Sequence, residues 1–317
     1  MKALDEANYL SFTSDILRTT NSTRSFLVLT VHLIDPKIGK SSPTIQSIKL
    51  CAQKLSQSHI AEYIKETWDK ICEEFVMDKS KIVSITTDGG ANMVAAVRLI
   101  VRNDRRVPRM AHCLNLIVDG VLKETYEFSA LCDHVKIIVT FFKQLVSASD
   151  QLRTEQQASE KKEGEVLTLI QVVSTRWNSC LDMLGRFVKL SALVANIFAT
   201  KSQTNKKTPD IVATSQLNVL RDLIALLGPF KEATEEISGA NYVTLSLAIS
   251  VSNLLRQVTD QTNPSTTLGE TVKKALLKKI DEELILFHNN TFLSAATILD
   301  PRFKRLHLCL QLPCHML

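Results

Sequence analysis

Residues 81–101 read KIVSITTDGGANMVAAVRLIV, and this stretch decides the class of fold. Its opening part, Lys81–Thr87, is rich in β-branched side chains, which favour a strand. Asp88-Gly89-Gly90 then interrupts the strand, and a helix is predicted from about Asn92 to Val101. A strand that passes through a tight turn into a helix is typical of α/β layer folds.

The sequence before this stretch also alternates between strand and helix patterns. Strands are predicted at Leu10–Ile16, Ser25–Asp35 and Ile45–Leu55, and an amphipathic helix between Ile60 and Phe75. The Ser25–Asp35 run is largely apolar on both faces, which suggests a strand that is covered on both sides. The order strand, strand, strand, helix, strand, helix therefore predicts an α/β domain.

Strand patterns end after this region, and a mainly helical sequence follows. A polar stretch, Ser149–Glu165, is either a solvated linker or a frayed helix. We expect an α/β domain over residues 1–145 and a helical domain over residues 146–317, appended to it or inserted into it. The predicted helices are His112–Leu122, Asp133–Val146, Trp177–Ala199, Ser215–Ile237, Leu245–Val258 and Thr271–His288.

Composition excludes several classes of protein. With 45% hydrophobic residues among 317, the chain can bury a sizeable core and is not disordered throughout. A net charge of +5 and a pI near 8.8 are mildly basic, just short of the pI that by itself suggests a nucleic-acid binder. No apolar run approaches a membrane span, so we expect no membrane association. Seven scattered cysteines without a Cys-x-x-Cys pair favour reduced thiols over a disulfide framework.

Two aspartates, Asp15 and Asp88, each lie at or just past the carboxyl end of a predicted strand. Sites in open α/β sheets are built at that edge, so the two carboxylates would converge if their strands are neighbours. Such a pair is a candidate catalytic site that holds Mg²⁺ for phosphoryl transfer. The alternative is structural: Asp88 shapes a strand-to-helix turn and caps the helix, and Asp15 is a surface residue.

A basic stretch lies between the predicted helix at 92–101 and the next one. It is either a solvated helix end with its loop or an edge that contacts phosphates. Its cations are opposed by Asp104 alone, and they are Arg98, Arg102, Arg105, Arg106 and Arg109.

Five segments, in order, resemble the motifs of hAT-superfamily transposases. Thr87–Ala96 is similar to T-D-x-x-x-N-M-x-x-A, and Ala111–Leu116 to A-H-x-L-N-L. Thr175–Ser179, with Met183-Leu184 after it, is similar to T-R-W-N-S-x-x-x-M-L. Two more segments resemble the helical-domain signatures of this superfamily. One is Leu226–Thr234, followed by Ser238-Gly239 and Thr244–Leu247, and the other is Ala296–Lys304. The chain is most similar to the BED-type zinc-finger proteins that derive from hAT transposons.

This resemblance implies an RNase H-like core, a mixed sheet with flanking helices, interrupted by a helical insertion domain. It implies three catalytic carboxylates that bind Mg²⁺, with Asp15 in the first position and Asp88 in the second. We expect the third, a glutamate, to be missing, because the chain ends soon after Lys304. We also expect the BED finger, and with it zinc, to be missing before Met1. The resemblance therefore implies vestigial Mg²⁺ ligands and no catalysis.

The resemblance also implies contacts with DNA. Arg176 and Trp177 match an Arg-Trp pair that lies near the active site, where the indole stacks on a displaced base. Trp177 as a core residue that opens a helix is the equal alternative. The candidate DNA contacts are Arg98, Arg102, Arg105, Arg106, His112, Arg176 and Trp177.

Two positions depart from the pattern. Leu17 stands where the resembled family has a tryptophan, and Arg109 replaces the cysteine of a Cys-x-x-His element that ends at His112. His112 alone is better explained as a helix-start or core histidine than as a metal ligand.

Three functions remain open at this stage. The chain is a nuclear, transposon-derived DNA-associated or protein-interaction module of the transcription-regulator type, without catalysis. Alternatively it is a fragment of an active transposase, or a metal-dependent nuclease that acts through the two aspartates alone. We expect weak, sequence-independent DNA binding, and the resemblance implies dimerisation of a longer form.

Overall fold

A computed structural model describes residues 2–19, 24–34, 45–101, 103–158, 163–172, 177–201, 208–238 and 245–303. The chain divides into two compact units. The sheet unit comprises Met1–Cys113, Ile237–Ser250 and Glu283–Leu317, and the helical unit comprises Leu114–Glu236 and Val251–Glu282. The first change of unit falls after Cys113, earlier than the expected boundary near 145, because α4 (Met110–Glu124) already carries the chain into the helical unit. That the two units are an RNase H-like core and its insertion stays a prediction.

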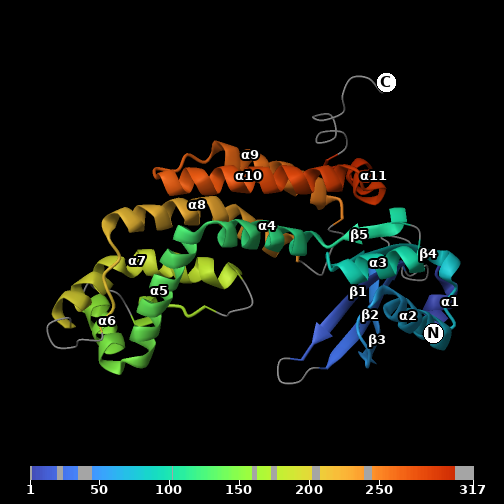
Figure 1. Cartoon of the computed structure of the whole chain (residues 1–317), viewed down its shortest axis with the longest axis horizontal. Helices are drawn as coiled ribbons and strands as arrows, with labels where there is room; N and C mark the ends of the chain where they lie inside the picture. Colours follow the sequence, from blue (N-terminus) through green and yellow to red (C-terminus); the bar gives the residue numbers. More distant parts are fainter. Residues whose placement is uncertain are drawn as a thin grey trace. The chain divides into compact units, whose positions relative to one another are not determined.

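The sheet unit is built on a mixed five-stranded sheet in the order β3-β2-β1-β4-β5 (Figure 1). β1 pairs antiparallel with β2 and parallel with β4, and β4 pairs parallel with β5. The expected neighbourhood of the strands that carry Asp15 and precede Asp88 is therefore confirmed. The strands are β1 (Leu10–Arg18), β2 (Ser25–Ile34), β3 (Ile45–Leu55), β4 (Ile82–Thr87) and β5 (Arg106–Pro108).

Helices pack against this sheet because their apolar stripes match its buried face. Trp68 of α2 (Ala61–Glu74) and Met93 of α3 (Ala91–Ile100) share one core with Phe12 and Leu29 of the sheet. The rings of Phe12 and Trp68 meet edge to face at 5.2 Å. On β2 one face is fully buried and the other only partly, so the prediction of a strand covered on both sides is wrong.

Two short helices complete the sheet unit. They are α1 (Lys2–Glu6) and α11 (Thr291–Leu299). Asn290 caps α11 by accepting hydrogen bonds from the backbone N–H groups of Phe292 and Leu293, and its own side-chain amide donates to the carbonyl of Arg106 at 2.8 Å. This cap joins the chain after residue 283 to β5 of the same unit.

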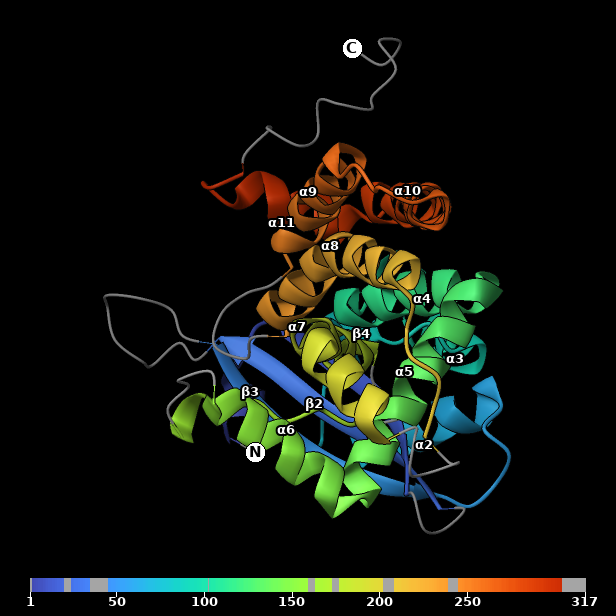
Figure 2. The same cartoon turned by 90° about the vertical axis from the view of Figure 1, so that its left-hand side faces the viewer.

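The helical unit contains α5 (Tyr126–Gln144), α6 (Val146–Ala158), α7 (Trp177–Lys201) and most of α8 (Thr214–Ile237). Most of α9 (Leu247–Gln261) and of α10 (Thr267–His288) also lies in it, and the two run side by side (Figures 1 and 2), joined by an Arg256–Asp281 ion pair. The stretch left open between linker and frayed helix is helical up to Ala158.

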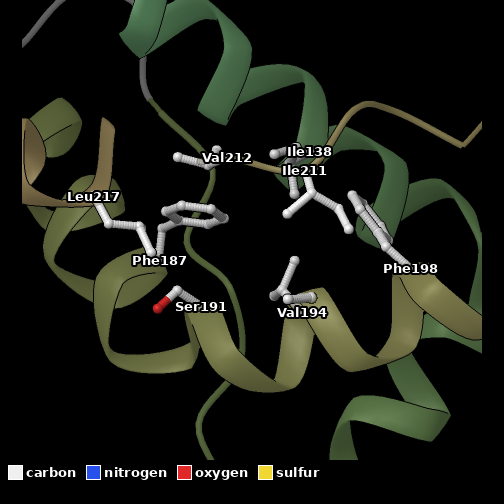
Figure 3. Close-up of a pocket in the computed structure, with 9 residues that line it drawn as sticks. Ile138, Phe187, Ser191, Val194, Phe198, Ile211, Val212 and Leu217 are labelled. Atoms are coloured by element: carbon white, nitrogen blue, oxygen red, sulfur yellow. The ribbon is translucent and has the colours of Figure 1, made fainter. Parts of the chain in front are cut away.

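Aromatic side chains fill the core of the helical unit. The rings of Phe142 and Phe198 stack at 5.6 Å. A void of about 10 Å³ remains beside Phe187 and Val194 (Figure 3), at the lower limit of room for one water molecule. It is a packing defect rather than a ligand site. By length and composition alone, α7 could span a membrane, but its buried residues pack in this core. The described cysteines are free thiols, as expected.

Candidate functional site

Asp15 is held by an arginine. β1 pairs with β4 as far as Ser14, opposite Thr87, and continues to Arg18, so Asp15 follows the last paired position. The guanidinium Nη2 of Arg109 donates to Asp15 Oδ2 at 2.6 Å, and the two side chains are 39% and 23% exposed. The candidate first carboxylate therefore has a protein counter-ion.

Asp88 shapes the turn between β4 and α3. Its Oδ1 accepts a hydrogen bond from the backbone N–H of Gly90 at 3.2 Å, which closes an Asx-type turn. A Cβ on Gly90 would lie 3.3 Å from that same oxygen, so glycine suits the close approach. The side chain of Asp88 does not cap α3, because the N-cap residue of that helix is Gly90. These contacts match one part of the structural alternative for Asp88, because it shapes the turn. The other part is wrong, because Asp88 does not cap the helix.

Two arginines of the basic stretch are used inside the sheet unit. Arg106 donates from Nε to Thr87 Oγ1 at 3.2 Å and from Nη2 to the carbonyl of Asp88 at 2.9 Å. Burial lowers the pKa of the Arg106 guanidinium. Arg105 donates to the carbonyl of Ile82 at 2.5 Å. The Arg105 head group bonds the first residue of β4 and the Arg106 head group bonds its last residue and Asp88, which makes both poor candidates for contacts with DNA phosphates.

The donor set does not fit a two-metal site. Such a site needs several oxygen ligands around each ion, and Mg²⁺ gives up its waters reluctantly. Here one carboxylate is neutralised by Arg109 and the other is engaged by Gly90. No group of three His, Cys, Asp or Glu side chains comes together in the part of the chain that the structure describes.

An open groove of about 750 Å³ lies on the sheet unit beside these residues. Basic side chains, Arg98 and Arg106, and acidic ones, Asp104 and Glu283, line it together. The groove is thus of mixed charge. Arg98 is exposed on α3, and it is the candidate DNA contact in this stretch whose side chain is best placed for solvent.

The remaining candidates are placed unequally. Arg102 and Arg176 lie outside the described residues. His112 is partly buried in the first turn of α4. Trp177 opens α7 and is only 7% exposed, and its indole Nε1 donates to Asn115 Oδ1 at 2.5 Å. Its surroundings match the alternative of a core residue that opens a helix.

The family-like motifs contact one another within each unit. In the helical unit, Asn115 bonds Trp177, and Lys231 pairs with Asp182. In the sheet unit, Ser246 donates to Asp300 Oδ2 at 2.7 Å. Each contact joins residues from two different motifs, so much of the motif pattern holds the fold together.

Sequence reasoning missed Arg109 and Asn115 as partners of the candidate residues Asp15 and Trp177, and it missed the contact between Ser246 and Asp300. Their signal was present, because all four lie in or next to the motifs that carry the resemblance. A motif identifies residues by their order in the sequence, but it does not say which of them contact one another in the fold.

The fold and the site define an α/β plus α protein with two aspartates on neighbouring parallel strands, Asp15 just past the last β1–β4 pairing and Asp88 just after β4. Residues 107–223 match the family model of the ZBED1 RNase-like helical domain. The chain is also 24% identical over 264 residues to "Putative transcriptional regulator tpeD" of the fungus Talaromyces stipitatus, a match that covers 73% of this chain and 30% of the relative. The chain thus spans less than a third of that relative's length. Together these matches support a relationship to ZBED and hAT proteins.

Proposed function

We propose that this chain is part of a transposon-derived regulator that associates with DNA in the nucleus and does not catalyse strand transfer. The match of residues 107–223 to the ZBED1 RNase-like helical domain carries this proposal. The similarity to a relative described as a transcriptional regulator points in the same direction.

An RNase H-like origin of the sheet unit is part of the proposal. The mixed sheet with flanking helices supports it, as do two aspartates on neighbouring parallel strands, Asp15 just past the last β1–β4 pairing and Asp88 just after β4. The absence of catalysis is supported by the ion pair between Asp15 and Arg109, which occupies the first carboxylate.

DNA binding then rests on the phosphate backbone. The proposed contacts are Arg98, which is exposed on α3, and Arg102 and Arg176, which lie outside the described residues. Phosphate contacts carry no direct sequence information and release counterions, so the binding is salt-sensitive. With a net charge of +5, we expect dissociation constants of roughly 10⁻⁴ to 10⁻⁶ M near physiological salt.

The test is a fluorescence-anisotropy titration of the chain against two unrelated duplexes and one hairpin-ended DNA at two salt concentrations. We expect similar affinities for all three DNAs and a loss of affinity at the higher salt. The double variant Arg98→Glu/Arg102→Glu should bind more weakly. The control, Lys274→Glu/Lys278→Glu on the exposed face of α10, changes the charge equally.

Three outcomes would contradict the proposal, the third only in its assignment of DNA contacts to α3. Nanomolar, salt-insensitive binding to one DNA would indicate a base-reading surface. A Mg²⁺-dependent nicking or strand-transfer activity that is abolished by Asp88→Ala would instead show that the chain is catalytic. Equal weakening by the α10 control would locate the binding away from α3.

A further inference from the structure

Arg109 reaches across the end of β4. It directly follows β5, and its backbone N–H donates to the carbonyl of Thr87, the last residue of β4, at 3.0 Å. Its guanidinium bonds Asp15 on β1, the strand on the other side of β4 in the sheet order. The side chain therefore passes over the strand end from which Asp88 continues.

The backbone of Arg109 is fixed on both sides. The N–H is held by Thr87, and the carbonyl accepts the backbone N–H groups of His112 and Cys113 at 3.0 and 3.1 Å, where α4 begins. The start of the Arg109 side chain is therefore fixed on the β5 side of β4, across that strand from Asp15.

Two guanidinium groups bond at this strand end. That of Arg109 pairs with the Asp15 carboxylate, and that of Arg106 donates to the backbone carbonyl of Asp88. An arginine stays protonated at any physiological pH, so these positive charges are permanent. A divalent cation that approached Asp15 would therefore have to displace the Arg109 guanidinium and would be repelled by its charge.

We infer that Arg109 takes the place of a divalent cation at Asp15, as a built-in counter-ion that closes this strand end to metal. The inference rests on the proposed function in taking Asp15 and Asp88 as the remnant of a metal-binding pair. It goes further in naming one side chain as the cause of the loss. Removing the positive charge of Arg109 should then open Asp15 to divalent cations.

The test is binding of Mn²⁺ alone, followed by the loss of the free-ion signal in electron paramagnetic resonance. We expect little Mn²⁺ binding to the unaltered chain. Arg109→Gln should bind Mn²⁺ about tenfold more tightly, because a repulsive unit charge close to the site is removed. The glutamine can still donate a hydrogen bond to Asp15. The gain should vanish in Arg109→Gln/Asp15→Asn.

Lys79→Gln is the matched control in the same unit. It removes one positive charge from an ion pair of similar exposure, with Asp69, which keeps Lys65 as a partner. We expect no gain of Mn²⁺ binding there. Equal gains in Lys79→Gln and Arg109→Gln, no gain in Arg109→Gln, or Mn²⁺ binding to the unaltered chain that Asp15→Asn abolishes would each overturn the inference.

A second measurement needs only the unaltered protein, in case Arg109→Gln does not fold. The Nε–H resonance of Arg109, assigned through its bonded correlations to the Arg109 backbone, should stay sharp when Mn²⁺ is added. Paramagnetic broadening of that resonance would place the cation beside Arg109 and overturn the inference. A failure to bind DNA would contradict the proposed function alone and would leave these results unchanged.

Discussion

The indole of Trp177 donates a hydrogen bond to the side-chain carbonyl of Asn115, 62 residues earlier in the chain. The two residues belong to two of the motifs that carry the resemblance, and the bond lies inside the helical unit. A tryptophan that is 7% exposed and bonded at its only polar atom is engaged in packing. This relationship bears directly on whether the ring takes part in DNA binding.

The fluorescence of Trp177 should not change when DNA is added. The chain has two tryptophans, so in Trp68→Phe the emission comes from Trp177 alone. We expect blue-shifted emission that acrylamide quenches poorly and that DNA leaves unchanged, because the ring is buried. Quenching on addition of single-stranded DNA would instead show that the ring reaches a base. Thermal unfolding of Trp68→Phe checks that the reporter variant is folded.

Asn115→Ala should destabilise the helical unit by about 1–3 kcal/mol, since it leaves the buried indole N–H without a partner. Urea unfolding, followed by circular dichroism, measures the change in the free energy of unfolding. The control is Asn218→Ala, which removes an exposed hydrogen bond to Arg221 on α8. That substitution should change stability by about 0.5 kcal/mol or less. Equal effects of the two would contradict a special role for Asn115.

Gly269→Ala should destabilise the chain by about 1–3 kcal/mol through overpacking. A Cβ there would lie 2.6 Å from the Cβ of Pro264 and 2.8 Å from Asp222 Oδ2. That carboxylate accepts hydrogen bonds from the backbone N–H groups of Ser265 and Thr266, just before α10, so it cannot move away freely.

Gly185→Ala is the matched control for the same helix-favouring change. Nothing lies within 4 Å of a Cβ at that position in α7. The alanine should stabilise the chain by roughly 0.5–1 kcal/mol, because it restricts the unfolded chain and favours helix. Differential scanning calorimetry should therefore show the melting temperatures of Gly269→Ala and Gly185→Ala shifted in opposite directions from that of the unaltered chain.

The contribution of Asp300 to stability should depend on pH. Its hydrogen bonds with Arg302 and then Ser246 hold the pKa of this carboxyl well below its usual range. A group whose folded pKa is depressed stabilises the fold above its unfolded pKa, about 4, and loses that contribution as the pH falls through the folded pKa. Asp300→Asn should thus lower the urea midpoint at pH 7 and have a smaller effect near pH 3.

Asp133→Asn is the comparison for that experiment. Its carboxylate pairs with Lys136 on an exposed helix face, where ion pairs contribute little. Its urea midpoint should stay close to that of the unaltered chain at pH 7. A pH-independent effect of Asp300→Asn would show that the substitution acts through packing rather than through charge.

Much of the fold could be predicted from the sequence because local patterns are strong where elements are long. The strand Ile45–Leu55 was predicted with its observed bounds, and α3 to within one residue at each end. β5 was missed because a strand of three residues carries no periodicity. It exists through its pairing with β4, which a local pattern does not contain.

The candidate site was predictable in part for the same reason. The sequence placed Asp15 and Asp88 at or just past strand ends, and the structure pairs their strands in parallel but continues β1 beyond Asp15. The partner of Asp15 was not predictable, because Arg109 lies 94 residues away and belongs, in sequence, to a basic stretch that suggests solvent or phosphates. Which charges meet is decided by the sheet order.

The bond from Asn290 to the carbonyl of Arg106 spans 184 residues, and it sets an order of events during synthesis. A ribosome releases β5 early, but the segment that caps α11 and holds β5 emerges only after the whole of the helical unit has been made. The helical unit can therefore begin to fold on the nascent chain while the sheet unit still lacks its last pieces. Translation that stops before Glu283 would leave a sheet without the segment that holds β5, joined to a finished helical unit, and such a product exposes surface that chaperones and proteases recognise.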